Sequence, residues 1–402
     1  MRAVRSNEVF NPGAFPKHTY VIRKSLDTRF TYEYRLEQAL HTVGFLTSII
    51  GPSKTGKTVL VEKVVGIDKR VLFSGSDFKS ANDFWEVVAK KVGLSMEGDL
   101  INTNATQGTG VADNIETRST TTKQKFFTGK DKVIEYFKQN NKVLVLDDFH
   151  YAPEEIQYDI AYQLKDAIRL ELKAIVISLP HRTDDAIRKN PDLSGRLNLI
   201  SIEPWKIEEL REIATTGFDK LGIKISDDIV TNLAQESLTS PQLMQSICFN
   251  LSFYLNIDEK EEIDSITDKS VLKDAYNLIT LNLPYSEVVK KLEAGPNPRG
   301  QKRKTYTLTT GENIDIYSLL IKAIAEDPPI TSISLDEIKR RTDLLIGSND
   351  KPDRNRVRNT IEQAFSIIKA SDAFYQVFEW KDNQIYILEP LFLFYLRWGT
   401  HI

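Results

Sequence analysis

The sequence predicts an α/β protein built on a parallel β-sheet, and three observations support this fold class. Residues 43–50 form an apolar segment suited to a buried strand, and residues 59–65 have the apolar spacing of a helix that packs on a sheet. Residues 142–146 and 173–178 are further short apolar runs, with a helical stretch at 154–171 between them. Strands that alternate with helices at this spacing predict parallel pairing with right-handed crossovers.

A complete phosphate-loop pattern, GxxxxGK[ST], lies between the first strand and its helix. Its residues are Gly51, Pro52, Ser53, Lys54, Thr55, Gly56, Lys57 and Thr58. The glycines let the backbone turn tightly and direct its N–H groups, with the helix dipole, at phosphate oxygens. We expect Lys57, facing solvent in the empty loop, to reach the β- and γ-phosphates, and the Thr58 hydroxyl to hold Mg²⁺. The pattern predicts binding of a nucleoside triphosphate, ATP; the alternative is a chance glycine turn before a helix.

Paired acids follow the apolar run at residues 142–146. Asp147, at the end of the predicted strand, is placed to hold Mg²⁺ through water, and Asp148 to orient or deprotonate an attacking water. Hydrolysis needs both tasks in addition to phosphate binding. The alternative is a turn capped by an aspartate side chain.

The other predicted strands of the sheet carry further candidate site residues. Residues 70–75 read as the second strand, and 173–178 end in a polar residue, Ser178. Ligands bind at the carboxyl ends of strands in open parallel sheets, which predicts Ser178 and Arg182 near the γ-phosphate. Arg196 lies in a loop before a short fifth strand.

Residues 98–122 interrupt this pattern with Thr, Asn, Gly and Ser and almost no large apolar side chain. We interpret them as a solvated, flexible insertion. Such a segment is either a passive loop or a surface that binds a partner.

Composition indicates a soluble chain of two or three domains. It has 402 residues, 41% of them hydrophobic, and a formal net charge of −3. No apolar run approaches the roughly 20 residues of a membrane span, so we expect no membrane association. The single cysteine, Cys248, excludes an intramolecular disulfide and favours a cytoplasmic location. The charge argues against a wholly basic nucleic-acid binder, although local basic patches remain.

Taken in order, these motifs resemble those of the AAA+ ATPase family over residues 18–258. The resemblance rests on the phosphate loop, the strand ending in paired acids, the polar end of the next strand and the Asn-Pro-x-Leu-x-x-Arg segment at 190–196. It implies that Arg196 acts in trans, on the ATP of a neighbouring copy, and therefore that the chain self-associates. The alternative role for Arg196 is a surface residue that caps a helix.

Departures from the family pattern resemble its STAND branch, the switch ATPases related to NLR immune receptors. Asp148 stands where a glutamate is usual, and Gln242 where a second sensor arginine is common. A small residue followed by Pro241 begins the third helix of a predicted lid, as in STAND proteins, which implies a nucleotide contact at Pro241. The resemblance implies an enzyme that holds nucleotide tightly and hydrolyses it slowly.

The predicted organisation has five parts. They are an N-terminal arm and lead-in helix at 1–40, a P-loop ATPase core at 41–205, a helical lid at 206–295, a basic linker at 296–315 and a C-terminal domain at 316–402. Helices at 317–325, 335–345 and 354–370, followed by a hairpin at 374–380 and 384–388, resemble a winged-helix domain. The ending at 390–398 is similar to that of prokaryotic STAND-like ATPases.

Two functions fit these patterns. One is an ATP-hydrolysing, oligomerising switch, plausible in bacterial antiviral defence, that works with a separately encoded effector or sensor. The other is a DNA-associated AAA+ ATPase, similar to a transposition helper or an initiator-like loader, with the winged helix on duplex DNA. Lys302–Lys304, Lys339–Arg341 and Arg354–Arg358 contain the basic residues for the second function, and neighbouring acids dilute their charge.

Overall fold

The structure is a computed structural model of the 402-residue chain. It describes residues 4–25, 29–79, 83–94, 98–105, 119–126, 129–179, 187, 190, 193, 195–260, 262–297, 300, 303–371 and 377–399, the two segments 98–105 and 119–126 by their backbone. These residues form two compact units. One contains Phe30–Ile50 and Leu60–Ser201, and the other Met1–Arg29, Gly51–Val59 and Ile202–Ile402.

The first unit contains a five-stranded, fully parallel sheet, as the sequence predicted. Its strand order is β2-β5-β6-β1-β7, so strands distant in the chain are neighbours. The strands are β2 (Arg70–Ser74), β5 (Val143–Asp147), β6 (Ala174–Ser178), β1 (Leu46–Ile50) and β7 (Leu197–Ser201). The inner strands are apolar and buried along their length, because helices cover both faces of the sheet.

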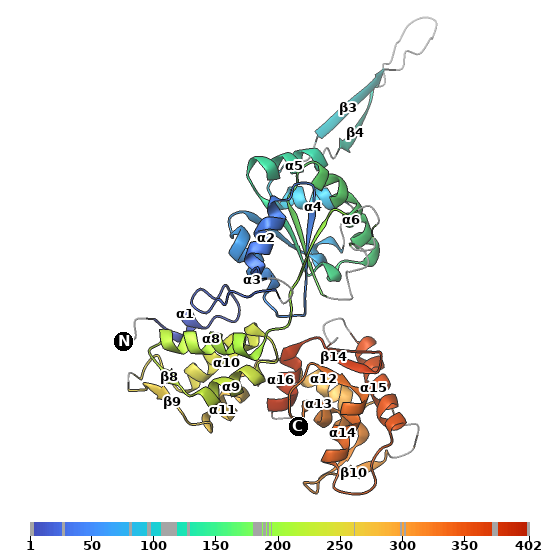
Figure 1. Ribbon diagram of the computed structural model, residues 1–402. Helices are drawn as coiled ribbons and strands as arrows, with labels where there is room; N and C mark the ends of the chain where they lie inside the picture. Colours follow the sequence, from blue (N-terminus) through green and yellow to red (C-terminus); the bar gives the residue numbers. More distant parts are fainter. Residues whose placement is uncertain are drawn as a thin grey trace, which may run out of the picture. The chain divides into compact units, whose positions relative to one another are not determined.

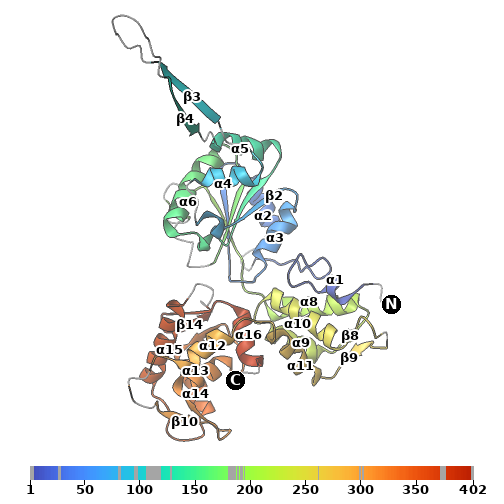
Figure 2. The ribbon, with the colours of Figure 1, turned by 180° about the vertical axis from the view of Figure 1, so that it is seen from behind.

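Helices flank this sheet on both sides (Figures 1 and 2). They are α2 (Tyr32–His41), α3 (Lys57–Val65), α4 (Phe84–Lys91), α5 (Gly129–Gln139) and α6 (Glu154–Arg169), with 3₁₀ turns η1 (Gly75–Phe78) and η2 (Phe149–Tyr151). Alternate strand residues such as Leu144 and Leu146 pack against α4, α5 and α6 in one buried cluster. In both views α2 and α3 lie on the side of the sheet opposite α6. The predicted helix at 154–171 is confirmed.

The prediction that residues 98–122 are a flexible insertion is corrected in part by the structure. Two antiparallel strands, β3 (Gly98–Ala105) and β4 (Ser119–Phe126), pair in continuous register, with Gly98 opposite Phe126 and Ala105 opposite Ser119 (Figure 1). After Ser119, the second strand contains three consecutive threonines, which are β-branched and favour extended backbone. The low apolar content that suggested irregular backbone is therefore compatible with a two-stranded hairpin.

The other unit begins with a short N-terminal helix and a mainly helical region. The elements are α1 (Ser6–Val9), α8 (Ile207–Lys220), α9 (Asp227–Glu236), α10 (Pro241–Tyr254), α11 (Val271–Thr280) and α12 (Ser286–Ala294), with strands β8 (Lys224–Ile225) and β9 (Ser265–Ile266). The three helices predicted after residue 205 correspond to α8, α9 and α10. Ser240 caps α10 by accepting a hydrogen bond from the Leu243 amide, and Pro241 occupies the first turn, where its missing N–H costs nothing.

The C-terminal part of this unit combines helices with two small antiparallel sheets, β10-β11 and β12-β14-β13. It contains α13 (Ile316–Ala325), α14 (Leu335–Leu345), α15 (Arg354–Lys369) and α16 (Pro390–Trp398), and strands β10 (Thr305–Thr307), β11 (Asn313–Asp315), β12 (Ser332–Ser334), β13 (Phe378–Lys381) and β14 (Gln384–Ile387). The three helices predicted at 317–370 are confirmed, and β13 and β14 are the described part of the predicted hairpin. β12 adds a third strand beside β14, giving the order β12-β14-β13.

A single hydrophobic core joins the helical region to the C-terminal part. The Tyr276 ring of α11 lies 5.6 Å from Phe394 and 4.7 Å from Trp398, both on α16. Tyr285 packs edge-on against Phe392 at 5.6 Å. Because α16 is the last helix and contributes three of these rings, it anchors the C-terminal part to α11. No helix among the described residues is long and apolar enough to cross a membrane.

Arg341 is a buried charge that holds the end of one helix in the C-terminal part. Its side chain is 1% exposed and pairs with Glu337 at 2.8 Å. The guanidinium also donates to the carbonyl oxygens of Glu326 and Pro328, beyond the end of α13. Hydrogen bonds from Arg340 and Arg341 hold the pKa of Glu337 at about 2. This carboxylate therefore stabilises the fold fully above its ordinary pKa, and the contribution is lost as the pH falls toward about 2.

We predict that Arg341→Met lowers the free energy of unfolding by about 3 kcal/mol, because it leaves several buried carbonyls without their donor and removes one of the two arginines from Glu337. Arg340→Met is the matched control, since Arg340 is 53% exposed and binds the same Glu337; its cost should stay below about 1 kcal/mol. Urea-induced unfolding of both variants checks this, and equal effects would contradict the assignment.

Candidate nucleotide site

The phosphate loop begins directly after β1 and ends in the first turn of α3. Lys54 and Gly56 both have positive φ, at 60° and 88°, which gives the loop its tight reversal. A Cβ built on Gly56 would meet nothing within 4 Å, so this glycine is required by its backbone conformation. A Cβ on Gly51 would lie 2.7 Å from the Ile202 carbonyl oxygen, so this glycine is required by close approach. The loop therefore has the shape that the motif predicted.

Lys57 differs from its expected position. Its side chain is only 8% exposed, and Nζ donates to the carbonyl oxygens of Gly51 at 2.9 Å and Pro52 at 2.6 Å. The ammonium group binds these acceptors because the loop folds back around it. The expectation of a solvent-facing lysine is therefore wrong. Phosphate binding adds a phosphate oxygen to these acceptors or exchanges one of them for it, since an ammonium group has three N–H donors.

Two of the predicted polar residues, Asp147 and Ser178, lie at the carboxyl edge of the sheet in the first unit. Asp147 ends β5 and pairs in register with Ser74 at the end of β2. Ser178 ends β6, is 3% exposed, and pairs in register with Ile50, the residue that precedes the loop. Parallel pairing thus brings Asp147 and Ser178 to the edge from which the phosphate loop departs in the chain. The carboxylate of Asp147 and the hydroxyl of Thr58 are hard oxygen donors, the kind that Mg²⁺ prefers.

Asp148 is exposed and sits in a left-handed turn, with φ 47° and ψ 41°. Its amide donates to Asp147 Oδ1 at 2.9 Å, which fixes the two acids relative to each other. Gly75 supports the same turn, because a Cβ there would lie 2.5 Å from the Asp148 carbonyl oxygen. The sequence analysis treated Gly75 only as the end of a strand. Its contact with residue 148 has no local sequence signal.

Arg196 lies at the amino edge of the sheet, beside the start of β1. Its carbonyl accepts from the Leu46 amide at 2.9 Å, and Leu197 pairs with Leu46 at the start of β1. The five residues of β1 therefore separate its backbone from the start of the loop by roughly 13 Å of strand. The side chain is exposed. Arg182, the other predicted arginine, lies outside the described residues.

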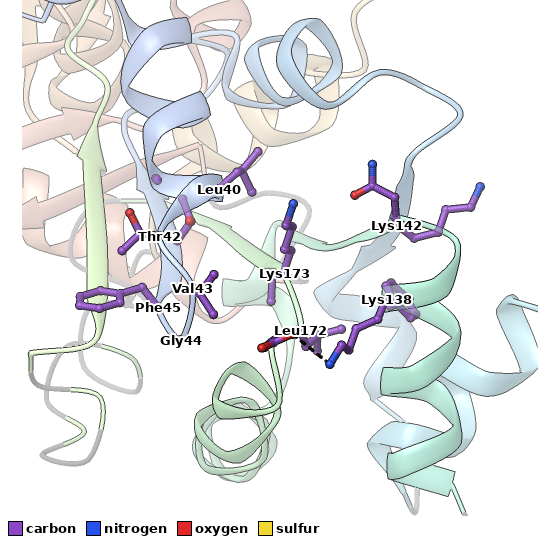
Figure 3. A pocket seen from close by; sticks show the side chains of 15 residues that line it. Leu40, Thr42, Val43, Gly44, Phe45, Lys138, Lys142, Leu172 and Lys173 are labelled. Atoms are coloured by element: carbon purple, nitrogen blue, oxygen red, sulfur yellow. Dashed lines mark ion pairs between the residues drawn. The ribbon is translucent and has the colours of Figure 1, made fainter.

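A hollow of about 240 Å³ opens at the same amino edge, before strands β1, β5 and β6 (Figure 3). Lys138, Lys142 and Lys173 line it, and Lys138 is paired with Glu171 at 3.0 Å. Lys142 donates to the Asp68 carbonyl. Two of the three lysines therefore already bind groups of this chain, and we assign no ligand to this hollow.

The start of α10 carries the other predicted nucleotide contact, Pro241. Leu238 and Thr239, just before it, both have positive φ, at 53° and 61°. Two consecutive non-glycine residues in this region are costly, and such backbone is retained only where packing enforces it. The turn lines a cleft of about 790 Å³ whose other wall includes Arg397 and Trp398.

Trp205 and Arg23 are two residues at the loop that the sequence analysis did not assign to the site. Trp205 Nε1 donates to the Thr55 carbonyl oxygen at 2.9 Å. The Arg23 guanidinium lies 4.5 Å from the centre of the Trp205 ring. Trp205 ends the predicted ATPase core, directly before the predicted lid, and no motif marks it as part of the nucleotide site. Arg23 lies in the N-terminal arm, and no motif marks it.

Comparisons with known proteins place few limits on the function. No family model matches the chain, and no curated protein matches it. Solved structures that are similar include a Walker-type ATPase of Pyrococcus abyssi, at 13% identity over 91% of this chain and 94% of that one, with a TM-score of 0.48.

Cdc6p of Pyrobaculum aerophilum is 12% identical over 98% of this chain and 97% of that one, with a TM-score of 0.43. The RuvB Holliday junction branch migration motor of Thermotoga maritima is 11% identical over 92% and 96%, with a TM-score of 0.39. These similarities are too distant to carry an argument about function. The α/β fold class rests on the parallel sheet itself, which has the phosphate loop after its first strand.

We predict that Gly51→Ala destabilises the nucleotide-free protein by about 1–3 kcal/mol, because its Cβ meets backbone at Ile202 that cannot turn aside. Gly13→Ala is the control, since a Cβ at that exposed glycine meets nothing within 4 Å. Chemical denaturation without nucleotide measures both. A Gly51→Ala protein as stable as Gly13→Ala would show that the loop does not approach Ile202 this closely.

Proposed function

We propose that this chain binds ATP with Mg²⁺ and hydrolyses it slowly, as an oligomerising switch of the AAA+/STAND type. The observation that carries the proposal is the phosphate loop, with left-handed backbone at Lys54 and Gly56, between β1 and α3. This loop directs backbone N–H groups and a helix N-terminus toward one point, an arrangement that binds phosphate. The carboxyl edge of the sheet adds the acids that hydrolysis requires.

Each site residue has a task in this proposal. The loop amides and Lys57 bind the phosphates, and Thr58 and Asp147 hold Mg²⁺, which neutralises charge on the phosphates when bound. Asp148 accepts a proton from, or orients, the attacking water, and its exposed position leaves room for that water. Ser178 provides a hydroxyl at the same strand edge. Pro241 is proposed to contact the nucleotide from the start of α10, and Arg182 is proposed near the γ-phosphate.

Self-association follows from the position of Arg196. Its backbone lies at the amino edge of the sheet, whereas the loop departs from the carboxyl edge. The side chain is exposed, so it is available to a second copy of the chain. A guanidinium supplied in trans offsets the charge that develops on the transferring phosphoryl group.

The C-terminal part, residues 316–402, is proposed to be a winged-helix domain that acts as a latch on the helical lid. The contact that supports this is an ion pair between Arg397 of α16 and Glu236 of α9, at 2.7 Å, with side chains 7% and 5% exposed. Trp398 Nε1 donates to the same carboxylate at 2.7 Å. Burial of both charges makes the pair costly to break on one side only.

The alternative, binding of duplex DNA by the winged helix, is less well supported because six basic side chains of the linker and the C-terminal part are already paired; Arg356 and Arg358 are not among these six. Arg354 binds Asp336 at 2.6 Å, and Arg340 and Arg341 bind Glu337. Lys339, Lys304 and Arg303 pair with Asp343, Asp350 and Asp315. Phosphate contacts would have to displace these acids, which lowers the gain from counterion release.

The biological setting remains part of the proposal. The resemblance to prokaryotic STAND ATPases suggests a signalling role such as antiviral defence, with separately encoded sensor and effector proteins. The chain's own contribution would be the nucleotide-controlled change between latched and released states.

We predict that Lys57→Ala and Arg196→Ala each lose most ATP turnover, up to about 10³-fold, for different reasons. Lys57→Ala loses nucleotide binding, whereas Arg196→Ala keeps it, because the loop is intact. An equimolar mixture should recover part of the activity, since a mixed interface joins an intact loop to an intact arginine. Steady-state ATPase assays over a range of protein concentrations test this. Concentration-independent turnover and a fully active Arg196→Ala protein would refute the trans role.

We predict that Glu236→Gln releases the latch, with a loss of about 3 kcal/mol in the free energy that holds α16 on α9, because Arg397 keeps its charge but loses its buried partner. Asp327→Asn is the control. Asp327 also pairs with Arg397 but is 80% exposed, so its loss should cost less than about 1 kcal/mol. Trypsin digestion and ATP turnover of both variants measure release. A Glu236→Gln protein as protease-resistant as wild type would remove the basis for the latch.

A further inference from the structure

We propose that Trp205 and Arg23 are positioning residues that hold the phosphate loop and transmit its rearrangement to helix α8. The inference rests on the nucleotide-binding function proposed above and adds the route by which occupancy of the loop is detected. The residues concerned all belong to the unit that contains Met1–Arg29, Gly51–Val59 and Ile202–Ile402.

The first step lies within the loop. The Pro52 carbonyl oxygen accepts hydrogen bonds from Lys57 Nζ at 2.6 Å and from Thr55 Oγ1 at 2.9 Å. When Lys57 turns to a phosphate, its bonds to the Gly51 and Pro52 carbonyl oxygens weaken, and the Thr55 hydroxyl becomes the main donor to the Pro52 oxygen. The backbone at Thr55 is therefore sensitive to where the lysine points.

The second step joins the loop to the segment before α8. Trp205 Nε1 donates to the Thr55 carbonyl oxygen at 2.9 Å, while Gly51 packs against the Ile202 backbone so closely that a Cβ would clash. The segment 202–205 thus contacts the loop at Gly51 and at Thr55. A shift of the Thr55 carbonyl either moves the Trp205 ring or breaks its hydrogen bond.

The third step links the Trp205 ring to helix α8 through Arg23. Arg23 lies over the Trp205 ring and is 6% exposed. It donates to the carbonyl oxygens of Glu203 at 3.1 Å and Pro204 at 3.0 Å, and it pairs with Glu209 at 3.0 Å. Glu209 caps α8 by accepting from the Lys206 amide at 2.8 Å. One guanidinium therefore fixes the ring, the strand-to-helix connection and the first turn of α8 together.

This geometry makes the first turn of α8 respond to the phosphate loop. The charged hydrogen bonds of Arg23 are buried, so they are stronger than exposed ones and restrict the ring to one orientation. A cation over an indole ring adds further attraction. The Trp205 indole N–H donates a hydrogen bond that joins the segment directly to the loop, which makes it the position to test.

The test compares Trp205→Phe with wild type in the full chain, with ATP and Mg²⁺ as the probe. Phenylalanine keeps a ring under Arg23 but has no N–H, so the Thr55 carbonyl loses one donor. We expect ATP affinity to fall about fivefold, the equivalent of one hydrogen bond of about 1 kcal/mol. Trp380→Phe, the same change on β13 of the C-terminal part, is the control and should leave affinity unchanged.

Hydrogen–deuterium exchange distinguishes positioning from a merely structural role. In wild type we expect ATP to change the exchange of amides 207–213 in α8 about fivefold. In Trp205→Phe, at saturating ATP, that change should fall below about twofold while the loop amides 52–57 still respond. Arg23→Met, which removes the charge but keeps the stem, should give the same loss. An ATP-dependent change in α8 that is equal in wild type and both variants would overturn the proposal.

The outcomes also separate this inference from the proposed function. If wild type binds no ATP, the nucleotide-binding function fails, and the coupling fails with it. If wild type binds ATP and Trp205→Phe behaves as wild type, only the coupling fails. Without nucleotide, Trp205→Phe should raise exchange of the loop amides about fivefold, since the Thr55 carbonyl is no longer held. Unchanged exchange of the loop amides in nucleotide-free Trp205→Phe would show that Trp205 does not hold the loop, whether or not the protein binds nucleotide.

Discussion

The parallel pairing of β1 with β6 and β7 is the constraint on which the rest of the first unit depends. Parallel strands point the same way, so their carboxyl ends meet at one edge and their amino ends at the other. Ile50 and Ser178 are thereby paired at one edge, and Leu46 and Leu197 at the other. Asp147 ends β5, which pairs in parallel with β6, so it falls at the first edge, and Arg196, which precedes β7, falls at the second.

A buried guanidinium performs a similar organising task at three places in the other unit. Arg23, Arg341 and Arg397 are 6%, 1% and 7% exposed, and each binds a carboxylate together with backbone carbonyls. Arginine suits this role because its planar group has five donors and keeps its charge when buried. Each therefore joins segments that share no hydrogen-bonded ladder. The same feature makes these joints sensitive to loss of a single partner.

The sequence predicted the sheet and most helices because their signals are local. Buried strands such as β5 are short apolar runs, α10 begins with Ser240 and Pro241, and the phosphate loop is a contiguous pattern whose glycines are required by its turn. The hairpin β3–β4 was not predicted, because threonine favours strands only when a pairing partner is available. Lys57 was placed wrongly because its acceptors are carbonyls that the folded loop itself creates.

The sequence by itself determined the α/β class, the phosphate loop and the positions of Asp147, Ser178 and Arg196 along the chain. Tertiary structure alone decided which residues distant in the sequence become partners. Arg23 and Glu203 are 180 residues apart, and Arg397 and Glu236 are 161 apart, so no local pattern connects them. It also decided that some basic residues of the C-terminal part, such as Arg340 and Arg354, face acids of the same chain. Local periodicity specifies backbone conformation, whereas a buried charge finds its partner only when the fold brings the two segments together.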